Sequence, residues 1–158
     1  MQFAQKYSVA VVFVLSCLCW KAQAQRPSEV VKWSTEVTKA TTTATQLTLS
    51  ATVADGWHIY ALSQPAGGPT PLKISVPSNS SYVLQAPVTD TSVVRHFDSN
   101  FNMETVYYLK AANFNLTLKP AGATAAETTP IDVRYQACSD RLCLPPYTAH
   151  LTASLKRR

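Results

Sequence analysis

The chain has 158 residues and a formal net charge of +5, and 15% of its residues are charged. A chain of this length suits one domain with a hydrophobic core. Three of the positive charges are the C-terminal Lys156–Arg158, and no basic segment is interleaved with aromatic residues. The composition therefore argues against a nucleic-acid-binding protein.

The sequence opens with the pattern of a secretory signal peptide. Lys6 precedes an apolar run from Val9 to Trp20, and Ala22 and Ala24 form a small-x-small cleavage pattern. We expect cleavage after Ala24, which makes residues 1–24 a signal peptide and predicts export to the periplasm. The apolar run is much shorter than the roughly 20 residues that span a bilayer. No later apolar segment is long enough either, so we expect no transmembrane helix in the mature chain.

Two of the four cysteines belong to this N-terminal segment. Val14–Cys17 loosely resembles a lipobox, so lipid attachment through Cys17 is an alternative form of processing. Signal-peptide cleavage would instead remove Cys17 and Cys19, and the mature chain would keep Cys138 and Cys143. In an oxidising compartment such a pair can persist as a disulfide.

Beyond residue 25 the dominant pattern is an alternation of apolar and polar residues with a period of two. Together with enrichment in Val and Thr, this pattern predicts half-buried strands, and the Gly-, Pro- and Ser-rich segments between them predict turns. Roughly seven to nine short strands indicate an all-β fold, an immunoglobulin-like antiparallel β-sandwich, for residues 25–158. In chain order the expected strands include Val30–Ala40, Thr45–Val53, Leu72–Val76, Glu104–Ala112, Asn115–Lys119, Ile131–Ala137 and Ala149–Leu155.

The segment YQACSDRLCLPP, Tyr135–Pro146, holds both mature cysteines close together. A structural disulfide across so short a loop removes about 2 kcal/mol of chain entropy, against about 4 kcal/mol or more for a long loop. A strained or accessible disulfide is instead exchangeable, as redox-active bonds are. The spacing alone leaves the structural and the redox interpretations open. A metal site needs two more ligands, and no His-x-x-His motif or second cysteine pair lies nearby, so we expect no metal and no other cofactor.

Three segments, in order, resemble one known family, the N-terminal periplasmic domain of the thiol:disulfide interchange protein DsbD. Tyr135–Pro146 resembles its cysteine motif, Asp55–Val76 its Asp-Gly-aromatic strand, and His96–Tyr108 its cap-loop region. The resemblance covers about residues 30–155. It implies an immunoglobulin-like domain with thiol–disulfide oxidoreductase activity of the protein-disulfide reductase type. Such a domain takes electrons from a thioredoxin-like protein domain and passes them to exported disulfide-handling proteins.

The resemblance also implies roles for individual residues. Cys143 would form the mixed disulfide with the partner, and Cys138 would be the resolving cysteine. Phe101 would lie in the cap loop and shield the disulfide, with Asp98 flanking that loop. The family continues into a membrane domain and a thioredoxin-like domain, whereas this chain stops at Arg158. We therefore expect a stand-alone form whose electron donor is a separate protein.

Three further residues are candidates for the surroundings of the cysteines. His58 and Tyr60 alternate with their neighbours on a strand and so share one face, and the resemblance places that face beside the cysteines. Arg141 lies between the two cysteines, where a cation would stabilise a thiolate. The alternatives are that Tyr60 is ordinary sandwich surface, that His58 is simply exposed, and that Arg141 is a solvated loop charge.

Two other classes of function compete with electron transfer. One is an immunoglobulin-like binding module in which the Cys138–Cys143 disulfide is purely structural. The other is an exported domain that handles a metal or haem with the two thiols as ligands. Redox cycling of the pair, with the fold intact, separates electron transfer from a structural disulfide, and metal analysis of the reduced protein tests the handling of a metal or haem.

Overall fold

The computed structural model describes residues 25–90, 93–122 and 126–155. The expected signal peptide, Cys17 and the terminal Lys156–Arg158 lie outside these residues. Within the described residues the chain forms one short helix and eleven strands, and every strand pairing is antiparallel. The elements are α2 (Pro27–Val30), β1 (Val31–Ala40), β2 (Thr45–Val53), β3 (His58–Tyr60), β4 (Lys73–Ser75), β5 (Tyr82–Asp90), β6 (Val94–Asp98), β7 (Met103–Leu109), β8 (Ala111–Pro120), β9 (Thr128–Tyr135), β10 (Ala137–Cys138) and β11 (Tyr147–Ser154).

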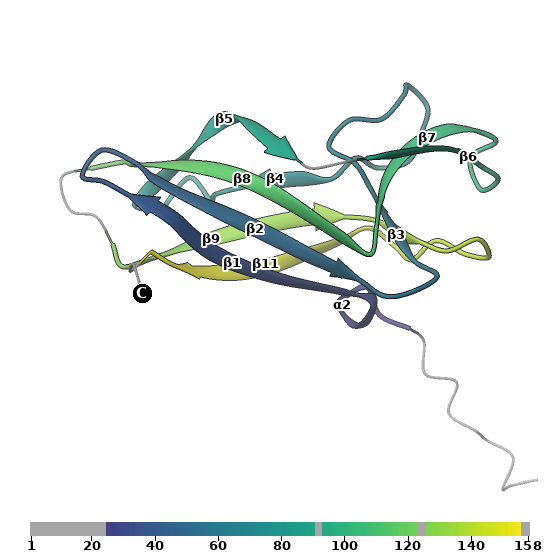
Figure 1. Cartoon of the computed structure of the whole chain (residues 1–158), viewed down its shortest axis with the longest axis horizontal. Coiled ribbons are helices and arrows are strands. Elements are labelled where there is room, and N and C mark those ends of the chain that lie inside the picture. The colour runs from purple at the N-terminus through teal and green to yellow at the C-terminus, as the bar shows by residue number, and fades with distance from the viewer. Residues whose placement is uncertain (1–24, 91–92, 123–125, 156–158) are drawn as a thin grey trace, which may run out of the picture.

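The strands form three sheets, with strand orders β1-β2-β8-β5, β11-β9-β4 and β10-β3-β7-β6. The first two sheets form the layers of the sandwich, because the ring of Trp33 on β1 packs against Phe114 of β8 and Tyr135 of β9. The third sheet gathers β3, β6 and β7 at one end of the elongated molecule (Figure 1). The expected immunoglobulin-like, all-β antiparallel fold is confirmed.

The core follows the period-two pattern of the sequence. On β2 the side chains of Leu47, Leu49 and Ala51 are buried, and the residues between them point outward. Thr48 and Ser50 on the outward face donate hydrogen bonds to Asn115 and Asn113 of β8, and the core holds buried residues of β8 and β9 as well. Alternate burial of this kind fixes the strand register, since a slip of one residue would expose the whole apolar set.

The expectation of a single strand over residues 104–112 is wrong. β7 ends at Leu109 and β8 begins at Ala111, and Lys110 between them has a φ of 61°, in the left-handed region. A strand cannot continue through that conformation. The chain turns here from the β10-β3-β7-β6 sheet into the β1-β2-β8-β5 sheet, and the Val53 N–H donates to the Lys110 carbonyl at 2.7 Å.

No helix within the described residues has the length and the hydropathy that a membrane crossing requires.

Candidate functional site

The two cysteines lie on a tight hairpin at the end of the molecule where the third sheet is found. β10 pairs with β3, which sets Cys138 opposite His58. Cys138 and Cys143 face each other as an antiparallel bridge, and a disulfide joins their sulfurs. The Leu144 N–H donates to the Ala137 carbonyl at 2.9 Å, so the strand pairing continues beyond the disulfide.

The turn of this hairpin is organised by Ser139. Its Oγ accepts hydrogen bonds from the N–H groups of Arg141 and Leu142 and donates to the Leu142 carbonyl at 3.2 Å. The Ser139 N–H also donates to the Leu142 carbonyl, at 2.9 Å. Serine at the first position of a turn bonds its own backbone in this way. The hairpin is therefore closed by hydrogen bonds as well as by the disulfide.

The two sulfur-bearing residues differ in exposure. Cys138 is fully buried, with a relative exposure of 0%, whereas Cys143 is only partly buried. Leu142, which precedes Cys143, is 48% exposed, and Pro145 and Pro146 after it are also exposed. Access to the disulfide is therefore through Cys143.

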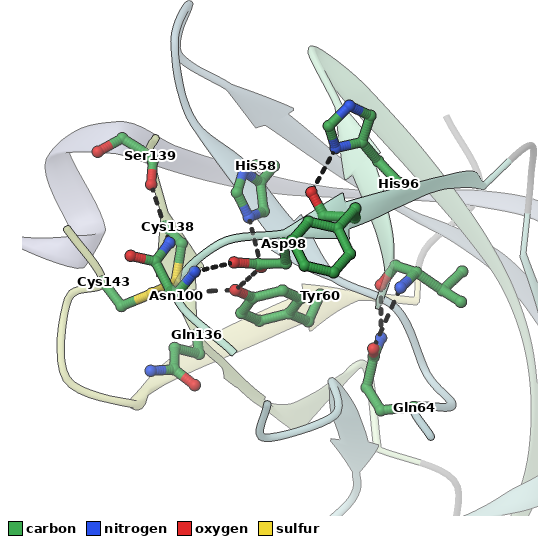
Figure 2. A network of polar contacts seen from close by, with 12 residues as sticks. His58, Tyr60, Gln64, His96, Asp98, Asn100, Gln136, Cys138, Ser139 and Cys143 are labelled. Carbon is green, nitrogen blue, oxygen red and sulfur yellow. Dashed lines mark hydrogen bonds and ion pairs between the residues drawn. A yellow bond between two sulfur atoms is a disulfide. The ribbon is translucent and has the colours of Figure 1, made fainter. Parts of the chain in front are cut away.

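A buried carboxylate, that of Asp98, lies close to the disulfide, and Figure 2 shows the contacts around it. The Tyr60 hydroxyl donates to Asp98 Oδ2 at 2.5 Å, and the same hydroxyl lies 3.8 Å from Cys143 Sγ. The Asn100 N–H donates to Asp98 Oδ1 at 2.9 Å, and Asp98 is 6% exposed. Asp98 thus ends β6 as a buried, hydrogen-bonded group.

The loop after Asp98 lies over the hairpin. The ring of Phe101 is half-buried and meets the ring of Tyr60 edge to face, with centroids 5.7 Å apart. The Asn100 side-chain amide donates to the Ser139 carbonyl at 3.4 Å, which ties the loop to the cysteine hairpin. Asn102 has a φ of 52°, a left-handed conformation that asparagine adopts more readily than most residues and that lets the chain reverse into β7. We define residues 98–102 as the cap loop.

His58 also lies against Asp98, next to Tyr60, with the centroids of the two rings 5.2 Å apart. It is 8% exposed, its ring stacks on Tyr107 at 4.4 Å, and Nε2 lies 3.9 Å from Asp98 Oδ2. That Nε2 atom is buried and has no hydrogen-bond partner among the described residues. An exposed position for His58, the alternative that the sequence left open, does not describe the structure.

Arg141 lies in the exposed turn between the cysteines. Its backbone N–H bonds to Ser139. Within the part of the chain that the structure describes, its guanidinium forms no hydrogen bond and no ion pair. The candidate residues therefore divide: Cys138, Cys143, Phe101, Asp98, His58 and Tyr60 come together, and the Arg141 side chain extends into solvent.

The surroundings fix the charge states of the three buried groups. Burial alone would raise the pKa of Asp98, but hydrogen bonds from Tyr60 and Asn100 outweigh it and hold the pKa below its usual value. Burial and the bond to Asp98 raise the pKa of Tyr60 far above its usual value, so the hydroxyl keeps its proton. Burial lowers the pKa of His58, although the negative charges of Asp98 and Asp140 oppose this effect. Near neutral pH the cluster holds a carboxylate, a phenol and a neutral imidazole.

An open cleft of about 300 Å³ lies between β6, the cap loop and the cysteine hairpin. His58, Asp98, Tyr107 and Asp140 are among the residues that line it, so water can reach the edge of the buried cluster. No three His, Cys, Asp or Glu side chains within the described ranges gather as metal ligands would.

Sequence reasoning missed three residues of this site: Asn100, Tyr107 and Ser139. Local signals existed for two of them. Asp98 and Asn100 form an Asx-type turn, and Ser139 opens the turn between the cysteines. Tyr107 had no such signal, because its contact with His58 depends on the pairing of β3 with β7.

Comparison with known proteins is informative at the level of the family. The family model of the N-terminal region of the thiol:disulfide interchange protein DsbD matches residues 22–155. The fold is similar to the N-terminal periplasmic domain of ScsB from Proteus mirabilis, with a TM-score of 0.61 and 18% identity over 84% of this chain; the chain spans 49% of that structure. It is also similar to the reduced N-terminal domain of DsbD from Neisseria meningitidis, with a TM-score of 0.51 and 16% identity over 82% of this chain and 89% of that one. No curated protein matches the chain.

Proposed function

Because the chain belongs to the family of the DsbD N-terminal domain, a family of thiol–disulfide interchange, we propose that Cys138 and Cys143 cycle between disulfide and dithiol. The pair accepts two electrons from a thioredoxin-like protein domain and passes them to exported disulfide-handling proteins. Residues 25–158 are the redox domain, and residues 1–24 direct it to the periplasm. The observation that carries this proposal is a family-typical cysteine pair on a surface hairpin with one sulfur accessible.

The proposed exchange has two steps. A partner thiolate attacks Cys143 Sγ, the intramolecular disulfide breaks, and Cys138 leaves as a thiolate that takes up a proton. The second thiolate of the partner then attacks the partner's own sulfur in the mixed disulfide and releases Cys143, which takes up the second proton. The partner is oxidised to its disulfide and this domain is reduced to the dithiol. The reverse sequence reduces an oxidised acceptor.

Exposure supports Cys143 as the attacked sulfur. In-line approach of a thiolate needs free space behind the sulfur, and Cys138 is fully buried while Cys143 is not. Leu142 and Phe97, which are 48% and 58% exposed, offer apolar side chains on the cysteine hairpin and on β6 for a partner to cover. Arg141 adds a positive charge on the turn, and a nearby cation lowers the cost of a thiolate.

Three further residues serve the accessible sulfur in this proposal. Tyr60, whose hydroxyl is 3.8 Å from Cys143 Sγ, donates a hydrogen bond to the thiolate once Asp98 no longer accepts its proton. Asp98 holds that hydroxyl in place. Phe101 covers the ring of Tyr60 and limits exchange with small thiols until a partner displaces the cap loop.

Trapping of mixed disulfides tests the proposal. Reduced Cys138→Ala protein, which keeps Cys143, is mixed with a thioredoxin-like protein that retains only its attacking cysteine, activated as a mixed disulfide with a small aromatic thiol. Cys143 displaces the small thiol, and the products are resolved on a non-reducing gel. We expect a covalent complex with Cys138→Ala and little with Cys143→Ala. Efficient trapping only by Cys143→Ala would reverse the polarity, and a lack of trapping by both variants would remove the redox function.

A second experiment, mild reduction of the wild-type protein, separates a redox-active disulfide from a structural one. Backbone hydrogen bonds and Ser139 already close the hairpin, so loss of the disulfide leaves its turn in place. We expect millimolar dithiothreitol to reduce the pair with the circular dichroism spectrum unchanged. Reduction that unfolds the domain would instead support a structural disulfide in a binding module.

A further inference from the structure

One buried side chain at this site has no task in the exchange steps above. His58 is 8% exposed as a residue, and its Nε2 atom is fully buried and has no hydrogen-bond partner within the described residues. An unpaired buried nitrogen of this kind lowers stability, and a hydrogen bond formed in another state of the protein would explain why it is kept. The nearest charged atom is Asp98 Oδ2, 3.9 Å away. That same oxygen accepts the proton of Tyr60.

The Tyr60 hydroxyl has one proton and two neighbours that can accept it. Asp98 Oδ2 accepts that proton, and its distance from the hydroxyl oxygen is 2.5 Å. Cys143 Sγ lies 3.8 Å from the same oxygen. While Asp98 holds the proton, Tyr60 offers Cys143 only an oxygen lone pair, which favours the neutral thiol. A donor that competes for Asp98 Oδ2 would release the Tyr60 proton to the sulfur, and a hydrogen bond to a thiolate favours the charged form.

We propose that His58 is a positioning residue that, on taking up a proton, binds Asp98 and so turns the Tyr60 hydroxyl toward the Cys143 sulfur. Protonated His58 becomes a donor at Nε2, and a movement of about 1 Å brings this atom from 3.9 Å to hydrogen-bond distance of Asp98 Oδ2. The proton released by the Cys143 thiol is thereby matched by the proton held on His58. No electrons move in this step. The inference deepens the proposed function, on which it rests, because it assigns the control of the reactive thiol.

Proton uptake by His58 depends on the charges that face it from each neighbouring element. Two of these groups are carboxylates that favour the imidazolium, one is a second imidazole that opposes it, and two are phenols. They are Asp98 and His96 from β6, Asp140 from the cysteine hairpin, Tyr60 from β3 and Tyr107 from β7. The cleft that His58 and Asp98 line gives the proton a route to water.

The coupling predicts an unusual pH profile for the Cys143 thiol. For an isolated thiol the logarithm of the alkylation rate falls by one unit for each unit of pH below its pKa. Here the state with protonated His58 has the larger share of thiolate. The rate therefore stays above the line extrapolated from alkaline pH, and a flat shoulder lies just above the pKa of His58.

The test uses iodoacetamide as the probe and the Cys138→Ala protein, in which Cys143 is the reactive thiol. We expect His58→Gln in that background to abolish the shoulder and to slow alkylation roughly fivefold or more near about pH 5, with equal rates near about pH 9. Tyr60→Phe keeps the ring but removes the shared hydroxyl, and it should abolish the shoulder in the same way. This second variant keeps the test valid where glutamine at position 58 does not fold.

His96→Gln is the matched control. It removes an imidazole that lines the same cleft, and Nδ1 of His96 pairs with the Phe97 carbonyl and not with Asp98. The shoulder should survive this change. A shoulder that persists in Tyr60→Phe would overturn the switch in favour of direct attraction between charges. A rate that falls by the same factor at every pH in His58→Gln would mean that His58 only packs the site.

Failure of this inference is distinguishable from failure of the proposed function. Alkylation needs no redox partner, whereas mixed-disulfide trapping does. If the Cys138→Ala protein shows no shoulder but is trapped through Cys143, the role of His58 is contradicted and the redox function stands. A shoulder without trapping supports the role of His58 and contradicts electron transfer to a thioredoxin-like partner.

Discussion

The ring of Phe101 rests on Tyr60, on the side of the domain where the cysteine hairpin is found. An edge-to-face pair of this kind contributes about 0.5–1.5 kcal/mol beyond the area it buries. The ring is only half-buried and lies outside the buried core cluster. Its removal should therefore affect access to the sulfurs more than it affects stability.

We predict that Phe101→Ala speeds reduction of the disulfide by small thiols several-fold. The melting temperature should fall by no more than about 4 °C, since about 1 kcal/mol corresponds to a shift of that order in a domain of this size. The rate is measured by quenching with an alkylating agent. Phe97→Ala is the control, because Phe97 is 58% exposed on the neighbouring strand β6 and should leave the rate unchanged. An unchanged rate with a large drop in melting temperature would make Phe101 a core residue.

Burial of neutral His58 gives the domain a specific dependence of stability on pH. Its pKa is lower in the folded state than the ordinary value of 6.5. The stabilisation from keeping this histidine neutral is complete above that value and is lost as the pH falls toward the folded-state pKa. We expect the free energy of unfolding in urea to decrease from neutral to mildly acidic pH in the wild type, and to decrease less in His58→Gln. Equal slopes in the two proteins would contradict the assignment.

At this scale the sequence predicted the residues of the site better than their environment. The cysteine motif drew attention to Cys138 and Cys143, and the family resemblance implied that His58, Tyr60 and Phe101 lie near them. The burial of Asp98 could not be predicted, because it results from pairing of β6 with β7 and from a tyrosine on β3, 38 residues earlier in the sequence. Local patterns do not report contacts that depend on the arrangement of strands.

At the scale of elements, the cysteine hairpin depends on its turn. The Ser139 hydroxyl makes three hydrogen bonds to the backbone of that turn. We predict that Ser139→Ala destabilises the domain by about 1 kcal/mol, the net contribution of a typical hydrogen bond. Amide hydrogen exchange at Arg141 and Leu142 should become faster. Ser99→Ala, at an exposed position in the cap loop, should change neither quantity. Unaltered exchange in Ser139→Ala would show that the disulfide and the backbone hydrogen bonds fix the turn without the hydroxyl.

Two strands had no recognisable signal in the sequence. β5 contains Pro87 and shifts its register against β8 between Gln85 and Thr89. It is an edge strand, where a proline is tolerated because one side of the backbone needs no partner. β6 is also an edge strand, and its first four residues are all exposed, so no alternation can appear in the sequence.

At the scale of the whole molecule, the core strand β8 and the cysteine hairpin belong to different sheets. β8 is a central strand of the β1-β2-β8-β5 sheet, and Leu116 within it is 1% exposed. We predict that Leu116→Ala lowers the free energy of unfolding by about 2–5 kcal/mol. Below the melting transition, the rate of disulfide reduction should stay as in the wild type.

Lys119→Ala is the control for this prediction. It lies on the same strand with an exposed side chain, and an exposed substitution of this kind changes stability by about 0.5 kcal/mol or less. A reduction rate that changes with Leu116 in the fully folded protein would indicate coupling between the core and the hairpin.

The fold class followed from the sequence because alternation and turn residues are local properties. The division into three sheets did not follow, since it depends on single residues such as Lys110, whose left-handed conformation redirects the chain. Lysine has no intrinsic preference for that region, so the sequence at Lys110 did not predict the turn between β7 and β8.

The turn at Ser139 also bears on how the oxidation state is communicated. Hydrogen bonds that do not involve sulfur close the hairpin, and they can persist when the disulfide opens. The domain can thus take up two electrons with little rearrangement of its backbone, and its oxidised and reduced forms have nearly the same shape. A partner then cannot distinguish the disulfide form from the dithiol form by backbone conformation. It must distinguish them by the chemistry of one sulfur atom, Cys143 Sγ. An encounter with the wrong form would therefore end without exchange.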